Sequence, residues 1–183
     1  MKKILMTALL LATTLLDAGS LEKIYTLYNQ KHYKQACQYG LHIFNKYKKN
    51  SKFVMLYGFS CLKADYIDRL AVPLTGLRAT KSERANASYF ATILLQKKLL
   101  YHALIDNVDI SYLVLPKTDY VLSKVFDLFT RKAYKKVDDK FYLKPEEANG
   151  ILYVLYIQPY GKIKKMVLEE RLEGNIIKTH KYW

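Results

Sequence analysis

From residue 21 to about residue 134, apolar side chains recur every three to four positions, the spacing that gathers them on one face of an α-helix. The clearest stripes of this kind run through residues 21–28, 33–47, 54–62 and 82–96. Polar links separate the first of them at residues 29–31, 48–51 and 64–65. The pattern predicts helices of about 10 to 16 residues joined by short turns. Residues 108–115 fit a short helix or an extended link, and Thr118 or Asp119 then caps a helix that runs to Phe129.

After about Val137 the apolar period changes to two, which is typical of β-strands. Residues 151–157 form a continuous apolar and aromatic run, as expected for a central strand that is buried on both sides. A turn signal precedes this run at Asn149-Gly150. Two more follow it, at Gln158-Pro159-Tyr160-Gly161 and at Glu173-Gly174-Asn175. The sequence therefore predicts an α+β fold: α-helical hairpins over residues 21–135, then an antiparallel β-meander of three to four strands over residues 136–183.

The helical region also contains a candidate repeat. Ala36 in Tyr33-Lys34-Gln35-Ala36 and Leu70 in Ile67-Asp68-Arg69-Leu70 lie 34 positions apart, the length of a tetratricopeptide repeat. Further positions fit the same repeat: Val54, Tyr57, Gly58 and Cys61 in a second unit, and Phe90, Ala91, Leu94 and Ala103 in a third. Residues 20–107 therefore resemble the tetratricopeptide-repeat family, which implies antiparallel helical hairpins with an extended concave surface for binding proteins. An irregular helical bundle is the alternative, and Pro73 is expected to kink the second unit or to mark a boundary.

The first twenty residues have the pattern of a secretory signal peptide. Lys2 and Lys3 precede an apolar run over residues 4–16, and small residues follow at Ala18, Gly19 and Ser20. The run is too short to span a bilayer comfortably, because a spanning helix needs about 20 apolar residues. We therefore expect residues 1–20 to direct export, with cleavage after Ala18 or Ser20, and the protein to reside in a bacterial periplasm. A leader retained as an N-terminal membrane anchor is the alternative.

Cys37 and Cys61 are the only cysteines of the chain. An even number of cysteines in an exported protein favours a disulfide, and this one would close a loop of about 25 residues. Two buried free thiols in a helical core are the alternative. The pair does not form Cys-x-x-Cys, so a redox-active role is not indicated.

The formal charge is +14, from 30 Lys and Arg against 16 Asp and Glu. Lysines outnumber arginines 25 to 5, a bias that an AT-rich genome produces without selection, so charge alone says little about the partner. Aromatic residues interrupt two basic stretches, at residues 45–53 and 131–136. Such stretches are typical of nucleic-acid binding in a cytosolic protein. Export argues instead for an anionic envelope surface or an acidic protein, although solvated helix ends explain each stretch as well.

Motifs of catalysis and cofactor binding are missing from the sequence. It contains neither a nucleophile elbow nor a phosphate-binding loop, and adjacent carboxylates such as Glu169-Glu170 point apart on a strand. The four histidines have no metal-ligand spacing. These are His32, His42, His102 and His180. We expect neither a cofactor nor a metal, and no enzymatic activity, unless dispersed residues assemble a site.

Seventeen tyrosines are the most unusual feature of the composition. Tyrosine rings bind proteins at low entropic cost, so some of them are expected to line a surface of the helical array. The candidate contact residues are Tyr25, Tyr28, Tyr39, Tyr57 and Lys63. The sequence thus predicts an exported interaction module that binds another envelope protein. The alternative is a binding protein for an anionic lipid, a cell-wall fragment or a small molecule.

Overall fold

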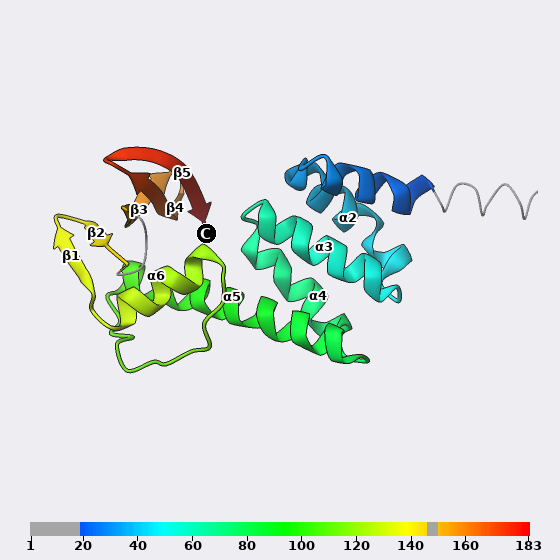
Figure 1. The fold of residues 1–183 in the computed structure, drawn as a ribbon, viewed down its shortest axis with the longest axis horizontal. Coiled ribbons are helices and arrows are strands. Elements are labelled where there is room, and N and C mark those ends of the chain that lie inside the picture. Colours follow the sequence, from blue (N-terminus) through cyan, green and yellow to red (C-terminus); the bar gives the residue numbers. More distant parts are fainter. Residues whose placement is uncertain (1–18, 146–149) are drawn as a thin grey trace, which may run out of the picture. The chain divides into compact units, whose positions relative to one another are not determined.

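A computed structural model describes residues 19–145 and 150–183 and confirms the α+β class, with helices followed by an antiparallel sheet (Figure 1). The predicted leader and the Asn149-Gly150 turn lie outside the described residues, apart from Gly19, Ser20 and Gly150. After a first described helix at residues 19–29, the helical elements are α2 (Tyr33–Tyr47), α3 (Ser51–Lys63), the 3₁₀-helix η1 (Ile67–Leu70), α4 (Ala71–Gly76), α5 (Lys81–Asp106) and α6 (Val121–Thr130). The strands are β1 (Tyr134–Val137), β2 (Lys140–Leu143), β3 (Ile151–Tyr160), β4 (Ile163–Leu172) and β5 (Asn175–Tyr182).

The chain divides into two compact units, one ending at Ala87 and the other beginning at Ser88, inside α5. We call the described part of the first, residues 19–87, the helical unit, and residues 88–183 the sheet unit. The sequence boundary near residue 135 marks the change from helix to strand. The compact units divide earlier because most of α5, residues 88–106, and all of α6 share a unit with the sheet.

Three helices pack closely in the helical unit around Gly40 of α2. A Cβ at this position would lie 2.7 Å from Tyr57 Cδ2 on α3 and 2.9 Å from Ile24 Cδ1 on the first helix. Ile24 and Tyr57 are fully buried, as are the two cysteines of α2 and α3. The absence of a side chain on Gly40 therefore allows the close approach that an amphipathic helix needs in order to bury its apolar stripe.

The turns of the helical unit fall where the polar links predict them, at residues 30–32, 48–50 and 64–66. Asn50 caps α3 by accepting a hydrogen bond from the Phe53 amide at 3.2 Å. Thr80 and Glu83 cap the start of α5, since Thr80 Oγ1 accepts from the Glu83 amide and the Glu83 carboxylate accepts from the Ala79 amide. These caps explain why the helices begin where they do.

The second helix of the second candidate repeat is broken in two. The 3₁₀-helix η1 passes into the short helix α4, and Pro73 lies in the first turn of α4, where its missing N–H is not needed. The expected boundary is therefore present, just before Pro73. The helix α5 runs without interruption from Lys81 to Asp106, through both Leu94 and Ala103 of the third candidate unit.

The sheet is a meander with strand order β1-β2-β3-β4-β5, and every neighbouring pair is antiparallel. The sheet has five strands, so the prediction of three to four is wrong. The additional strand is β1, which begins at Tyr134, inside the region that the sequence assigns to helices. The sequence of β1, Tyr-Lys-Lys-Val, is short and its three last residues are exposed, so it has no apolar alternation to reveal it. Asp138, with φ of 50°, begins the turn into β2.

Glycines with positive φ lie in the turns of the two long hairpins of the sheet. Gly161 has φ of 60° at the first turn position between β3 and β4, as a type II′ turn requires, and Glu173 and Gly174 both have positive φ between β4 and β5. The turn predicted at residues 158–161 is therefore displaced, because β3 continues through Pro159 to Tyr160. Pro159 is tolerated there since β2 pairs with β3 only as far as Tyr156.

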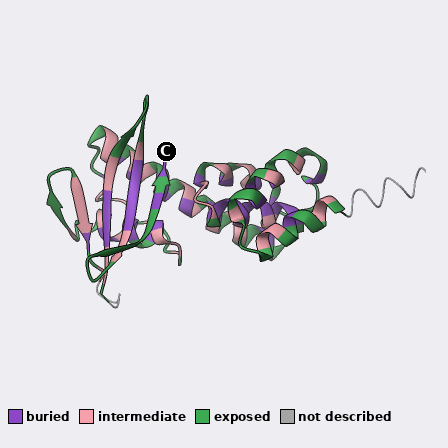
Figure 2. Ribbon diagram, turned by 90° about the horizontal axis from the view of Figure 1, so that it is seen from above, coloured by how far each residue is buried: buried purple, intermediate pink, exposed green. Residues whose placement is uncertain are grey.

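One face of the sheet packs on helices within the sheet unit. Phe129 of α6 contacts the rings of Tyr134 and Phe141, with centroids 5.2 Å apart in each case. The middle of β3 and β4 is buried (Figure 2), and Leu155 and Leu168 face each other there in register. From α5, Lys97 donates a hydrogen bond to the backbone oxygen of Trp183, and Tyr101 donates one to Lys164 O at 2.8 Å. Tyr182 is buried in this core, whereas Trp183 is 64% exposed and is held through its backbone oxygen.

Candidate functional site

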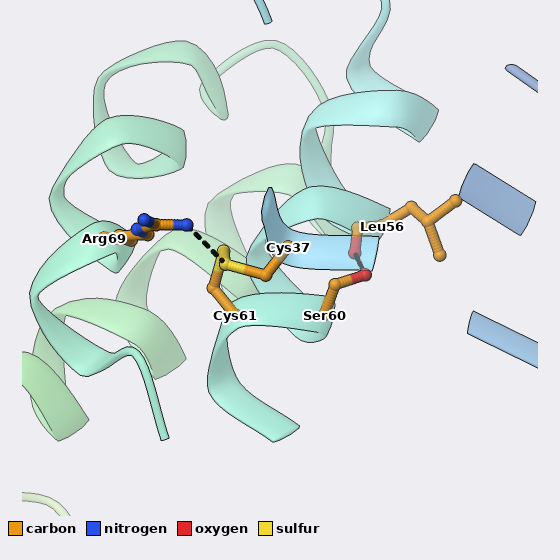
Figure 3. Close-up of a disulfide and its surroundings, with 5 residues drawn as sticks. All are labelled: Cys37, Leu56, Ser60, Cys61 and Arg69. Atoms are coloured by element: carbon orange, nitrogen blue, oxygen red, sulfur yellow. Dashed lines mark hydrogen bonds between the residues drawn. A yellow bond between two sulfur atoms is a disulfide. The ribbon is translucent and has the colours of Figure 1, made fainter. Parts of the chain in front are cut away.

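The disulfide predicted between Cys37 and Cys61 is present and joins α2 to α3 (Figure 3). Both residues are fully buried, and the sulfur of Cys37 accepts a hydrogen bond from the Arg69 guanidinium at 3.5 Å. Ser60, the neighbour of Cys61, bonds back to the Leu56 carbonyl at 2.7 Å. The bridge thus holds α2, which carries Tyr39, and α3, which carries Lys63, in a fixed relation.

Tyr57 is not a surface residue, and its assignment as a partner contact is wrong. Its side chain is fully buried among α2, α3 and the first helix, and its ring lies 5.2 Å from that of Phe44. Burial raises the pKa of its hydroxyl, and the positive charge of Arg69 offsets part of this rise. Helical spacing alone cannot separate a core tyrosine from a surface tyrosine, because both belong to the same apolar stripe.

Tyr25 and Tyr28 are three residues apart on the first helix, so their side chains are neighbours on one face. Tyr25 is 59% exposed, whereas Tyr28 is half-buried and meets the Tyr33 ring edge to face at 5.3 Å. Burial, and then the charge of Tyr33, raise the pKa of Tyr28. We call Tyr25, Tyr28 and Tyr33 the tyrosine cluster. Tyr33 is not among the contact residues that the sequence predicts.

The other two candidate residues lie outside this cluster. Tyr39 of α2 is half-buried, and the ammonium of Lys23 lies 4.7 Å from the centre of its ring. Lys63 is exposed at the end of α3. Tyr39 therefore forms a cation–π contact between two helices, and Lys63 complements the dipole at a helix C-terminus.

Positive charge is concentrated in the helical unit. Residues 19–87 contain twelve Lys and Arg against four Asp and Glu. One of the four acids, Glu83, is bound into the cap of α5, where hydrogen bonds from the Ala79 and Arg78 amides hold its pKa below the ordinary value. Lys31 and Lys34 are exposed beside the tyrosine cluster, and Lys46, Lys48, Lys49 and Lys52 are exposed around the α2–α3 turn.

A cavity of about 320 Å³ lies in the sheet unit, between α6 and the connection that joins α5 to α6. Gln96 of α5 lines it, together with Ser123 and Thr130 of α6. Leu113, Val114, Leu115 and Phe126 supply its apolar part. The sequence does not reveal this cavity, because its residues come from three segments and the connection carries no motif.

The opposite face of the sheet bears a charged network centred on Glu169 of β4. Its carboxylate is 6% exposed and accepts hydrogen bonds from Tyr156 Oη and Arg171 Nε, each at 2.8 Å. Burial by itself raises the pKa of Glu169, but the hydrogen bonds from Arg171 and Tyr156 and the charges of Arg171 and Lys140 bring it below the ordinary value. Burial and the bond to Glu169 raise the pKa of Tyr156 to about 12. The carboxylate is satisfied by its neighbours and functions as a structural group.

The histidines do not assemble a reactive site. His180 is buried and lies 2.9 Å from Glu170, while His102 pairs with Asp106 at 3.6 Å on the exposed surface of α5. Within residues 19–145 and 150–183, no three His, Cys, Asp or Glu side chains are grouped so that they could hold a metal ion. In the same described part, none of the helices is both long enough and apolar enough to cross a membrane.

Comparison with protein-family models, with curated proteins and with solved structures finds no match to this chain. The resemblance to tetratricopeptide repeats therefore stays a prediction from the residues themselves. The tyrosine cluster and the cavity beside α6 are two candidate binding regions of the described residues.

Proposed function

We propose that the chain is a non-enzymatic binding module of the bacterial cell envelope, whose helical unit binds an acidic face of another envelope protein. The observation that carries the proposal is the tyrosine cluster, an exposed and a half-buried ring on one helix face joined by a third ring from α2, with lysines on both sides of the turn. Aromatic rings of this kind are enriched among the residues that dominate binding energies.

The tyrosine cluster is partly preorganised for binding. The edge-to-face contact between Tyr28 and Tyr33 fixes two of its rings, and the first helix, which carries Tyr25 and Tyr28, packs closely on α2 through Ile24 and Gly40. Side chains that are already ordered lose less entropy when a partner binds, which leaves more of the contact energy as affinity. Tyr25, the most exposed of the three, is the ring that a partner would bury.

Charge specifies the kind of partner. With twelve basic and four acidic residues, the helical unit attracts an acidic surface over several ångströms and repels a basic one. Lys31 and Lys34 lie at the turn between the first helix and α2, so an acidic group of the partner can reach them while its apolar neighbours cover Tyr25. This predicts association that slows as salt screens the charges.

The disulfide supports an oxidising compartment as the place of action. Structural disulfides persist in exported proteins and are rare in the cytosol of mesophilic bacteria. The leader pattern at residues 1–20 points to the same compartment. An envelope protein with an acidic face is therefore the partner that both arguments favour.

Site-specific photo-crosslinking in cells tests this proposal. A photoreactive phenylalanine analogue replaces Tyr25 in one strain and Tyr160 in another, since both tyrosines are 59% exposed but Tyr160 lies at the end of β3. We expect one reproducible crosslinked protein from position 25 and none of the same mass from position 160. Equal crosslinking at both positions would contradict the proposal, as would crosslinking at position 160 alone.

Two further variants separate binding from folding. Lys31→Glu combined with Lys34→Glu reverses the charge beside the cluster, so the crosslink from position 25 should fall at least tenfold while the melting temperature is unchanged. Tyr57→Ala serves as the core control, because deleting a buried aromatic ring costs about 3–5 kcal/mol of stability. A crosslink that survives the double charge reversal would show that the partner does not recognise this surface.

A further inference from the structure

Two strands of the sheet extend beyond their neighbours as a projecting hairpin. β3 pairs with β2 only as far as Tyr156, and β4 pairs with β5 only from Met166 onward, whereas β3 and β4 pair with each other up to Tyr160 and Ile163. We call residues 158–165 the arm. All of its residues except the last are exposed, and they are drawn in green in Figure 2. The sheet thus ends on this side in a narrow projection made only of the β3–β4 hairpin.

The arm carries two large apolar side chains together at its tip. Tyr160 and Ile163 are direct partners in the β3–β4 register, so their side chains lie next to each other on the same face. Tyr160 is 59% exposed and Ile163 is 40% exposed. The ammonium of Lys165 lies 3.7 Å from the centre of the Tyr160 ring. The tip therefore combines an amphipathic ring, a branched aliphatic side chain and a cation.

The charge of the arm is exclusively positive. Lys162, Lys164 and Lys165 belong to it, and residues 148–168 contain no Asp or Glu. Among the residues that the structure describes, no acidic side chain forms an ion pair with any of these three lysines. Their charge is therefore available to an anionic partner, which it attracts before contact is made.

The arm is held in place and is a poor template for the addition of another strand. Tyr101 of α5 donates a hydrogen bond to Lys164 O at 2.8 Å and ties the arm to the helix. Pro159 has no N–H to offer to a further strand beside β3, and lysines follow one another along β4; both features oppose edge-to-edge pairing. A narrow hairpin also provides no concave wall that could enclose a small molecule. These observations favour a broad anionic surface that the tip can enter.

We propose that the arm docks the protein on the surface of an anionic phospholipid bilayer. Tyr160 and Ile163 enter the boundary between headgroups and acyl chains, where amphipathic aromatic rings are favoured. Lys162, Lys164 and Lys165 pair with the lipid phosphates, while their aliphatic stems lie along apolar surface. Each lysine close to such a surface strengthens binding about fivefold. The proposal concerns the sheet unit and does not rest on the tyrosine cluster.

The other end of β4 provides an internal comparison. Leu172, Ile176 and Ile177 flank the β4–β5 turn and are 37%, 53% and 55% exposed, so this end is at least as apolar as the arm. Glu173 lies in this turn, and no lysine lies between Leu172 and Ile177. If apolar exposure alone decided docking, this end would bind a bilayer equally well. We expect that it does not, because it lacks the cations.

Tryptophan quenching in vesicles tests insertion with the full chain, its disulfide intact. Trp183→Phe removes the only tryptophan, and Tyr160→Trp or, as the matched control, Ile177→Trp introduces a new one. The vesicles contain equal amounts of phosphatidylglycerol and phosphatidylcholine with brominated acyl chains, which quench only a tryptophan that has entered the bilayer. We expect a blue shift and quenching at position 160 and neither at position 177. Vesicles of phosphatidylcholine alone should produce neither effect at either position.

Sedimentation with unbrominated vesicles of the same composition measures the contribution of charge. Replacing the three lysines of the arm by Gln should weaken binding about a hundredfold, since each contributes about fivefold. The matched control replaces three exposed lysines of the helical unit by Gln, and it should leave binding within about fivefold of the wild type, because only charges close to the surface escape screening. The three control positions are Lys48, Lys49 and Lys52.

The contribution of the apolar tip is measured in the same way. Tyr160→Ser combined with Ile163→Ser should weaken binding about tenfold, because both side chains then lose their burial in the bilayer. Ile177→Ser removes a side chain of similar exposure at the other end of β4 and should leave binding unchanged. Melting curves of every variant exclude unfolding as the cause of a loss.

Four results would overturn the proposal. The first is the absence of quenching at position 160 in anionic vesicles, and the second is equal quenching at positions 160 and 177. The third is binding that survives the loss of all three lysines of the arm, which would place the contact elsewhere. The fourth is binding that the double serine variant retains in full, which would leave only attraction to a polyanion. A lipid contact at Tyr160 yields no protein crosslink, so this proposal and the proposed function fail separately.

Discussion

The helical unit and the sheet unit bury different kinds of side chain. Among the described residues, the core of the helical unit is apolar apart from groups such as Ser60 and Glu83, and it is closed by a covalent bridge. The sheet unit contains more buried polar side chains, namely Gln96, Lys97, Ser123, Thr130, Glu169 and His180. An apolar core specifies packing, whereas buried polar groups need particular partners. Among the described residues, each unit has one buried side-chain atom without a hydrogen-bond partner, Tyr57 Oη in the helical unit and Gln96 Oε1 in the sheet unit.

The two units also differ in the sequence separation of the residues that contact each other. The bridge of the helical unit joins residues 24 positions apart, and its helices contact their sequence neighbours. The sheet unit joins Lys97 to Trp183 and Tyr101 to Lys164, which are 86 and 63 positions apart. Long-range contacts form only after a large loop has closed, so the helical unit is expected to form first and independently of the chain end.

Removal of the disulfide should have the largest effect on the difference in stability between the two units. In the chain-entropy model a loop of this length contributes about 3 kcal/mol, so replacing Cys37 and Cys61 by Ser should lower the stability of the helical unit by that amount. Hydrogen exchange of α2 and α3 should then rise sharply while that of β3 and β4 stays constant.

Reductant provides the control for this prediction. Dithiothreitol should shift the wild-type protein to the behaviour of the double variant and leave the double variant unaffected. Loss of protection in both units at once would contradict the division of the chain into two separately stabilised cores.

An intermediate effect is expected at Gly40. Replacing it by Ala introduces a Cβ at 2.7 Å from the Tyr57 ring and 2.9 Å from Ile24, and overpacking of this kind costs about 1–3 kcal/mol. The gain of up to about 1 kcal/mol in helix propensity offsets part of this cost. Thermal unfolding of Gly40→Ala should therefore occur at lower temperature than that of the wild type.

Gly76→Ala is the matched control, because its new Cβ would lie at an ordinary 3.7 Å from Val54. This variant should be as stable as the wild type or slightly more so. If Gly40→Ala were equally stable, the three helices would not meet as closely as the structure describes.

The smallest effect concerns Glu169 in the sheet unit. Because its folded pKa is below the ordinary value of 4.5, its ionised form stabilises the fold above pH 4.5, and this contribution is lost as the pH falls through the folded pKa. Glu169→Gln should lower the melting temperature at pH 7 by a few degrees, since Arg171 is only partly buried and regains water.

The pH dependence gives this prediction its sign. The difference in melting temperature between wild type and Glu169→Gln should be constant from pH 7 to about 5 and should shrink below pH 4.5. A difference that grows in acid would mean that the fold raises the pKa of Glu169 above its ordinary value instead of lowering it.

Features that depend on a local sequence pattern could be predicted, whereas features that depend on contacts between distant segments could not. The polar links at residues 29–31 and 48–51 marked the first turns correctly, because helix periodicity and turn residues are local signals. The disulfide followed from an even number of cysteines in a chain whose sequence predicts an export leader. The extra strand β1 was missed because exposed lysines conceal its alternation, and Tyr57 was misplaced because its burial depends on Gly40 of another helix.

The candidate site illustrates the same limit more strongly. The tyrosine cluster was half predicted, since Tyr25 and Tyr28 are close in sequence, but Tyr33 joins them only through the turn between two helices. The cavity could not be predicted at all. Gln96, Leu115 and Asp127 come from three segments that meet only in the folded chain, and no spacing rule links them.

The position of the disulfide has a consequence for proteolysis. The segment between Cys37 and Cys61 contains the turn at residues 48–50 and its exposed lysines, which are natural sites for a trypsin-like protease. A cut after Lys48 or Lys49 divides the backbone but leaves both fragments covalently attached through sulfur. The nicked molecule retains α2 and α3 as one piece, so this exposed basic turn can be cleaved without releasing the tyrosine cluster that precedes it.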